Sequence, residues 1–401
     1  MSSARRILVV TYWSLREPLV QAYTLPYVRL MLQASPRGSV AHLVTLEKDA
    51  DAIGARLAEP GIVHHAFAYA RFGPAGALMV LRVLWSLLRL IRRERIDAIH
   101  AWCTPAGALG YVLSVLSGRP LVIDSYEPHA EAMVENGTWK RGGAAHRILL
   151  AFERLQSRRA KELIACASGM QRYAAMRYGL PGDRPMHVKP ACVDLDRFDW
   201  RRVKDPRLLR ELDLEGKVVA LYAGKFGGIY LDQEVFDLLR AAREHWGERL
   251  RVLLLTAHRP QELEPMMRKA GLDPSIFIIR HVPHEQVPEY MGLADFALTP
   301  VKPVPTKAFC TPIKDGEYWA MGLPVIITAG ISDDSAIIAR EGIGSVLEEL
   351  SVDAYRKAVR EVDALLRSAT RRALYDRIRP VAERFRTFAI AAAIYQRIYG
   401  R

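Results

Sequence analysis

Residues 310–326, CTPIKDGEYWAMGLPVI, join two apolar segments, FALTPV at 296–301 and PVIITA at 324–329. The apolar segments predict buried strands, and the stretch between them predicts a loop followed by a helix. A strand, a crossover helix and a second strand together form the unit of a parallel sheet. This stretch therefore favours an α/β fold and places its own charged residues beside a strand end.

Three charged side chains, Lys314, Asp315 and Glu317, lie at the expected start of that helix. The first N–H groups of a helix have no partner within it and favour anions, so the site suits a phosphate with a hydroxyl-binding carboxylate nearby. Helix capping by Thr311 or Asp315 is the alternative explanation of the same residues.

Strand and helix patterns alternate along the whole chain in two successive series, separated by a polar stretch at 196–209. Regular alternation of this kind is typical of parallel sheets covered by helices. We expect domains at 1–198 and 199–383 and a closing helix at 384–401 that returns to the first domain. The predicted strands are RILVVTY, AHLVTL, AIHAW, PLVIDS, LIACAS and MHVKPA in the first series and VVALYAG, LRVLLLTA, IFIIRHV, FALTPV and PVIITA in the second.

Length and composition agree with two soluble globular domains. The chain has 401 residues, of which 50% are hydrophobic and 25% charged, enough apolar material for two cores. The four cysteines are widely spaced and form no Cys-x-x-Cys motif, so free thiols in a reducing cytoplasm are expected. The N-terminus has no signal-peptide pattern, and a cytoplasmic location is expected.

The net charge of +13 lies mostly in residues 1–200 and suggests an anionic partner for that half. In the apolar segment 76–95, a helix would place Arg82, Ser86, Arg89 and Arg93 on one stripe and Leu81, Leu84, Trp85, Leu88 and Ile91 on another. Arginines interrupt the segment, which argues against a membrane span. Packing on a sheet is one interpretation, and docking on the inner face of an anionic membrane is the other. Nucleic acid is not expected, because no aromatic-interleaved basic patch occurs.

Ligands of parallel sheets bind beyond the carboxyl ends of the strands, which draws attention to two further loops. In VIDSYEPHAEAM, at 122–133, Glu127 and His129 follow a strand, and a histidine between carboxylates is a candidate catalytic group. In LYAGKFGGIYLD, at 221–232, glycines permit close approach of an anion to the backbone, and Lys225 adds a charge suited to phosphate. The loop after the first strand lacks Gly-x-Gly-x-x-Gly, which argues against a dehydrogenase.

Nearly the whole chain resembles the retaining glycosyltransferases of family 4, which have the GT-B fold. The resemblance is carried by four segments: ELIACASGMQRYAAMRYG at 162–179, VKPACVDLDRF at 188–198, VPHEQVPEYMGLADFALTP at 282–300 and TPIKDGEYWAMGLPVI at 311–326. It implies two Rossmann-like domains with parallel sheets facing a central cleft. It also implies transfer of a sugar from a nucleotide-sugar to a carbohydrate or lipid-linked acceptor, in polysaccharide, glycolipid or other glycoconjugate synthesis.

Carried over residue by residue, the resemblance implies that Glu317 binds the ribose hydroxyls of the donor. The donor diphosphate would lie at Gly224, Lys225, Gly227 and Gly228, with Lys314 and the backbone of Thr311, Pro312 and Ile313 nearby. His281 and Val282 would lie near the nucleobase. His129, with Glu127, matches the position of a histidine beside the donor sugar. The common requirement is stabilisation of an oxocarbenium-like sugar and a departing diphosphate.

The chain departs from the family pattern at three places. Phe309 occupies the position of an expected first glutamate, eight residues before Glu317. The GKFGGIY turn lacks an Arg-plus-Lys pair, and Lys314 is the candidate for the second charge. The segment LREPLVQ, at 15–21, replaces a glycine-rich turn after the first strand.

No metal site or cofactor is predicted. The Asp194–Asp196 pair resembles a metal-binding Asp-x-Asp motif but falls where the first domain ends. The His281, His284 and Glu285 set contains Pro283, which disfavours the regular helix of a His-Glu-x-x-His zinc site. Two other functions remain open: a sugar-nucleotide epimerase or hydrolase on the same fold, and a nucleotide-sugar-binding protein without catalysis.

Overall fold

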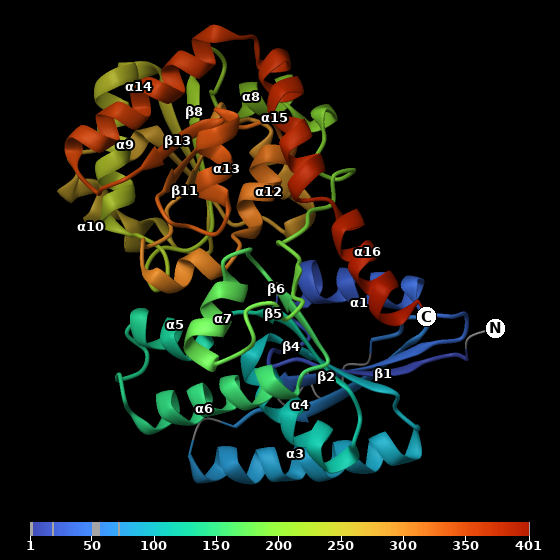
Figure 1. Cartoon of the computed structure of the whole chain (residues 1–401). Coiled ribbons are helices and arrows are strands. Elements are labelled where there is room, and N and C mark those ends of the chain that lie inside the picture. Colours follow the sequence, from blue (N-terminus) through green and yellow to red (C-terminus); the bar gives the residue numbers. More distant parts are fainter. Residues whose placement is uncertain (1–2, 18–19, 50–56, 71–72, 401) are drawn as a thin grey trace. The chain divides into compact units, whose positions relative to one another are not determined.

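The computed structural model describes residues 3–17, 20–49, 57–70 and 73–400 of the chain. It divides into two compact units, one formed by residues 1–190 together with 389–401 and the other by residues 191–388 (Figure 1). The last helix, α16 (Phe388–Tyr399), thus belongs to the first unit except for its first residue.

Unit 1 contains a seven-stranded, all-parallel sheet with the strand order β3-β2-β1-β4-β5-β6-β7. Its central strands are almost fully buried, as parallel strands covered on both faces must be. The strands are β1 (Arg6–Val10), β2 (Val40–Glu47), β3 (Ile62–Ala68), β4 (Ala98–Trp102), β5 (Leu121–Tyr126), β6 (Glu162–Ala165) and β7 (His187–Val188).

The helices of unit 1 flank this sheet. Helix α3 lies beside α4, on the side of the sheet away from α1 (Figure 1). The helices are α1 (Leu25–Ala34), preceded by a short π-helix (Val20–Thr24), α3 (Pro74–Arg93), α4 (Cys103–Ser117), α5 (His129–Glu135), α6 (Ala144–Arg159) and α7 (Met170–Tyr178).

Unit 2 contains a six-stranded parallel sheet with the order β10-β9-β8-β11-β12-β13, which is the Rossmann arrangement. The strands are β8 (Val218–Ala223), β9 (Leu250–Leu255), β10 (Phe277–Arg280), β11 (Phe296–Thr299), β12 (Val325–Thr328) and β13 (Gly344–Leu347). The main helices are α8 (Pro206–Glu211), α9 (Gln233–Trp246), α10 (Pro260–Lys269), α11 (Val287–Met291), α12 (Ile313–Ala320), α13 (Asp334–Glu341), α14 (Val352–Ser368) and α15 (Arg371–Phe385).

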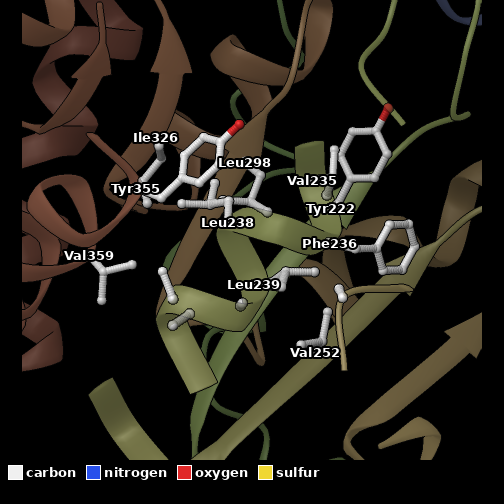
Figure 2. Packing of buried hydrophobic residues seen from close by; sticks show 14 of the residues in the cluster. Tyr222, Val235, Phe236, Leu238, Leu239, Val252, Leu298, Ile326, Tyr355 and Val359 are labelled. Atoms are coloured by element: carbon white, nitrogen blue, oxygen red, sulfur yellow. The ribbon is translucent and has the colours of Figure 1, made fainter. Parts of the chain in front are cut away.

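One core of unit 2 lies between the sheet and helices α9 and α14. Figure 2 shows its interlocking side chains, with Tyr222 and Leu298 from the sheet beside Phe236 and Leu239 of α9. A second core, on the other face, includes Tyr318 and Trp319 of α12 and fixes that helix against the strands. The buried side chains on the inner face of α12 therefore fix the position of the whole helix, including its first turn.

The predicted α/β fold with two parallel-sheet domains is confirmed, with two omissions. Strands β3 and β13 were not predicted, and both are edge strands of their sheets. Neither segment reads as an apolar run: β3, IVHHAFA, contains two histidines and is largely half-exposed, and β13, GSVL, has only four residues and begins with glycine and serine.

Two expectations about helices need correction. The segment 384–401 is not one helix, because α15 continues to Phe385 and α16 begins at Phe388. The side chains that α3 buries match the apolar stripe named from the sequence only in part: Ile91 is buried, but Leu81 and Trp85 are exposed. Val83 and Leu87 are buried in their place. Apolar character alone did not show which of the two leucine-rich faces meets the protein.

Candidate active site

The candidate donor site of unit 2 lies where the strand order reverses. Strands β8 and β11 are neighbours, and their connections leave in opposite directions along the sheet. In open parallel sheets, ligands usually bind beyond the carboxyl ends of the strands at such a reversal. The glycine turn 224–228 follows β8, and the loop leading to α12 follows β11.

Lys314, the second residue of α12, has the most unusual environment of the predicted site residues. Its side chain is only 8% exposed, and its Nζ lies over the rings of Tyr230 and Tyr222, 4.1 and 4.7 Å from their centres. Among the described residues, no hydrogen-bond acceptor contacts this Nζ. Burial lowers the Lys314 pKa to about 8, so at neutral pH the residue is a buried cation without an anionic partner in contact.

The glycine turn brings the backbone close to this ammonium group. A Cβ atom on Gly224 would lie 2.7 Å from Lys314 Nζ, and Gly224 has a φ of +154°. The Tyr222 hydroxyl donates a hydrogen bond to the Lys225 carbonyl, which fixes the turn, while the Lys225 side chain is exposed. Gly227 and Gly228 have φ values of +75° and +65°, a conformation that glycine adopts readily. The structure thus brings Gly224, Lys225 and Lys314 together.

Glu317 lies one turn further along α12, with a side chain 12% exposed. Its Oε1 is 3.6 Å from Nε2 of His284, which belongs to a short 3-10 helix after β10. From the sequence, His284 was weighed only as a zinc ligand, and that role was judged unfavourable. The structure instead makes it a neighbour of Glu317, and only the folding of the β10 loop over α12 creates that contact.

The remaining residues predicted for the donor site lie before α12 and after β10. Pro312 is the residue before α12 and Ile313 its first residue, while the Thr311 hydroxyl lies 3.3 Å from that of Ser332. His281, exposed, and Val282, half-buried, directly follow β10. Because β9 lies between β10 and β8 in the sheet, these two residues are at the same carboxyl edge as the Gly224 turn but two strands away from it.

Asp315 has a structural role. It is fully buried, accepts a hydrogen bond from the Thr299 hydroxyl, and hydrogen-bonds Asp334, which pairs with the buried guanidinium of Arg386. Burial raises the pKa of both carboxyls, and two carboxyls can share a hydrogen bond only when one is protonated. Asp315 therefore fastens α12 to β11 and α13. The capping interpretation is wrong for Asp315, since its carboxylate is used for this anchor.

In unit 1, Glu127 and His129 follow β5 at the carboxyl edge of the sheet. His129 is the first residue of α5, and its Nδ1 lies 3.5 Å from Glu127 Oε1. The His129 side chain is 24% exposed and the Glu127 side chain 28% exposed, so a ligand can reach both. Glu131, in the same segment, instead pairs with Arg141 and Arg177 at 2.9 and 3.1 Å and holds the local structure.

A buried carboxyl that the sequence did not single out lies beneath His129. Glu153 of α6 is fully buried and accepts hydrogen bonds from the Ala130 N–H and the Tyr178 hydroxyl, both 2.8 Å, and from Thr104. Burial raises the Glu153 pKa to about 7. Through Ala130 this group fixes the peptide next to His129. Its signal in the sequence is only a glutamate on the inner face of an amphipathic helix.

Backbone strain marks the same edge of the unit 1 sheet. Cys103, directly after β4, has a φ of +68°, and Ser125, within β5, has a φ of +49°. Left-handed non-glycine residues are costly and cluster at functional sites. The strain at Ser125 coincides with a register irregularity between Ile123 and Tyr126, which redirects the chain toward Glu127.

No group of three or more metal-ligating side chains occurs among the residues that the structure describes. Phe309 ends the short 3-10 helix Pro305–Phe309 and is half-buried. Lys225 and Lys314 are the two lysines that the glycine turn and the start of α12 place near each other.

Two Rossmann-like units with their polar residues at the strand ends define a protein of the GT-B class. Residues 24–191 match the model of the glycosyl transferase 4-like domain, and residues 217–363 match that of the glycosyl transferases group 1. The two models together cover most of the chain, which belongs to the GT-B glycosyltransferases. No curated protein matches it in sequence.

Solved structures agree on the fold. The sucrose-phosphate synthase of Thermosynechococcus elongatus superposes with a TM-score of 0.74 at 15% identity, covering 99% of this chain and 98% of that one. WaaG, a glycosyltransferase of lipopolysaccharide biosynthesis, gives 0.72 at 17% identity, with 99% and 100% covered. Anabaena HepE, solved with UDP and glucose, gives 0.71 at 14% identity, with 98% and 99% covered.

Proposed function

We propose that this protein transfers a sugar from a nucleotide-sugar donor to a carbohydrate or lipid-linked acceptor with retention of anomeric configuration. Its product would be a polysaccharide, a glycolipid or another glycoconjugate. The observation that carries the proposal is Lys314, whose buried ammonium lacks a hydrogen-bond acceptor among the described residues and lies against the Gly224 turn. A buried cation in such a position is stabilised by an anion, and a donor diphosphate is an anion of the right kind.

In this proposal the residues of unit 2 hold the donor. Lys314 and Lys225 bind the diphosphate, together with N–H groups of the turn that contains Gly227 and Gly228. Glu317 accepts hydrogen bonds from the ribose hydroxyls, and His284, 3.6 Å away, orients its carboxylate. The backbone of His281 and Val282 contacts the base. The backbone from Thr311 to Ile313 forms the wall next to the phosphates.

In unit 1, His129 would hydrogen-bond the transferred sugar, with Glu127 setting its tautomer through the 3.5 Å contact. Electrostatic stabilisation of the oxocarbenium-like sugar and of the departing diphosphate would supply most of the rate. No protein nucleophile is assigned, and the two lysines would neutralise the leaving group without a metal. Full activity after treatment with EDTA would agree with this, and loss of activity restored by a divalent cation would contradict it.

The direct test is a thermal-shift screen with UDP-, GDP-, ADP- and dTDP-sugars, starting with UDP-glucose because HepE was solved with it. A donor at 100 times its dissociation constant stabilises the fold by about 2.7 kcal/mol. Lys314→Met should abolish the shift, whereas Lys269→Met, an exposed lysine of α10, should preserve it. Absence of any shift across the four nucleotides in the wild-type protein would reject the proposal.

Two other activities are separated by the fate of the bound donor. Phe309, in place of an expected glutamate, favours a protein that binds the donor without turnover, which would show a thermal shift and no product across an acceptor panel. A hydrolase or epimerase would consume donor without any acceptor. Transfer requires an acceptor, and the anomeric configuration of the product, read by NMR, tests retention.

A further inference from the structure

Helix α3 presents an apolar face to solvent that its own unit does not cover. The helix buries Val83 and Leu87 against the unit. On its outer side Leu81 and Trp85 are 56% and 61% exposed, and Leu78 is 49% exposed. Among the described residues α3 is the one helix long and apolar enough to cross a membrane, with only 28% of its most apolar window buried.

The same helix is strongly basic. No acidic residue occurs between Pro74 and Arg93, while the helix carries four arginines: Arg82 near its middle and Arg89, Arg92 and Arg93 in its last two turns. Arg93 pairs with Glu94, but among the described residues no carboxylate pairs with Arg82, Arg89 or Arg92. The Arg89 guanidinium lies 5.2 Å from the centre of the Trp85 ring, so charge and apolar surface are directly adjacent.

A groove of about 400 Å³ runs beside this face, between α3 and the edge strand β3. Arg89 and Arg93 line it together with His65 and Phe67 of β3. Burial and neighbouring charges lower the His65 pKa to about 4, so the positive charge of the groove at neutral pH comes from the arginines. Its size and charge suit a phosphate-bearing headgroup.

We propose that α3 docks the protein on an anionic lipid bilayer, lying in the plane of the interface. Leu78, Leu81 and Trp85 enter the boundary between headgroups and acyl chains, and the arginines contact lipid phosphates. An apolar stripe flanked by arginines is the pattern of an interfacial helix. A membrane span is disfavoured, since Val83 and Leu87 are packed in the unit and Arg82 and Arg89 interrupt the apolar length. Two copies meeting through α3 would oppose like charges.

The test is co-sedimentation of the full chain with vesicles of phosphatidylcholine containing about one-third phosphatidylglycerol. Binding is expected at about 0.05 M NaCl, with strong weakening at about 0.5 M, because salt screens the arginines. Each arginine near the surface contributes about fivefold to partitioning, so Arg82→Gln/Arg89→Gln should bind about 25-fold more weakly. Leu81→Ser/Trp85→Ser should lose binding as well.

The matched control is Arg172→Gln/Met176→Ser, which removes one arginine and one exposed apolar residue from α7 of the same unit. This control should bind like the wild type. Wild-type protein that stays in the supernatant, or α3 variants that bind as well as the control, would overturn the proposal. The proposal would also be overturned if the wild-type protein formed a dimer that the α3 substitutions dissociate and showed no binding to vesicles. Thermal unfolding of each variant verifies its fold, and the result does not depend on glycosyl transfer.

Discussion

The ammonium nitrogen of Lys314 lies 4.1 Å from the centre of the Tyr230 ring, in a position closed to solvent. The ring faces offset part of the cost of burying this charge, because their electron-rich surface attracts a cation. They do not supply a counter-charge. The lowered Lys314 pKa indicates that the two rings offset only part of the free energy of burying the charge, and the rest lowers the stability of the folded protein.

Lys314→Met is therefore expected to stabilise the protein while removing donor binding. A pKa lowered from 10.5 to about 8 corresponds to a cost on the order of 3 kcal/mol at neutral pH. Methionine fills similar space without a charge. Chemical denaturation should show an increase in the free energy of unfolding of up to that size. A variant that is less stable than the wild type would contradict the assigned environment.

The affinity for a nucleotide-sugar should depend on pH through the same residue. Lys314 is charged below its pKa of about 8 and neutral above it. A bound diphosphate favours the charged form, so the dissociation constant should be lowest below pH 8 and rise tenfold per unit well above it. Calorimetric titration from pH 6.5 to about 9.5 measures this. A flat profile would remove Lys314 from the diphosphate site.

Gly224 and Gly271 form a pair for testing the turn, since Gly271 follows α10 and is not among the proposed donor-binding residues. A Cβ at position 224 would lie 2.7 Å from Lys314 Nζ, whereas one at 271 would meet nothing within 4 Å. Both have positive φ, +154° and +66°, so each alanine substitution costs at least about 1 kcal/mol of backbone strain. Only Gly224→Ala should also weaken the donor-induced thermal shift, since it displaces the ammonium. Equal effects on donor binding would show that the close approach is unimportant.

Glu153 should make unit 1 pH-sensitive. Its pKa is raised from 4.5 to about 7, so between these values the folded protein binds a proton that the unfolded chain releases. Stability should therefore fall as pH rises from 4.5 to 7, by an amount on the order of 3 kcal/mol. Glu153→Gln should abolish this dependence and be the more stable protein at pH 7. The measurement is the free energy of unfolding of both proteins from about pH 4.5 to 7.5. Equal pH dependence in the wild type and in Glu153→Gln would contradict the prediction.

The strand pattern could be predicted from sequence wherever a strand is buried on both faces. A continuous apolar run such as VLLL, at 252–255, is typical of a covered strand or of a core helix, and its short length between polar segments favours the strand. The strands β3 and β13 could not be predicted in this way, because histidines interrupt the apolar pattern of IVHHAFA and GSVL has only two apolar residues after its glycine and serine. The bend between α15 and α16 likewise has no proline or glycine to signal it.

The candidate site was predictable in part, for a physical reason. Residues just after parallel strands must share one edge of a sheet, so Lys225, Lys314 and Glu317 could be grouped from spacing and resemblance. The surroundings of these side chains could not be predicted from the sequence. The contact of His284 with Glu317, and the placement of Glu153 beneath His129, depend on loops and helices that meet only in the folded chain.

By itself, the sequence determined the α/β class, the two parallel sheets and the loops that carry polar chemistry, because strand burial and the 3.6-residue helical period are local properties. The tertiary structure alone decided which charges serve the fold and which are free to bind. Asp315, adjacent to Lys314 in the chain, is used to anchor α12 through Thr299 and Asp334. Lys314 points instead to the Gly224 turn, and none of the described residues hydrogen-bonds its ammonium group. Neighbouring residues on a helix face different surroundings, and only packing assigns those surroundings.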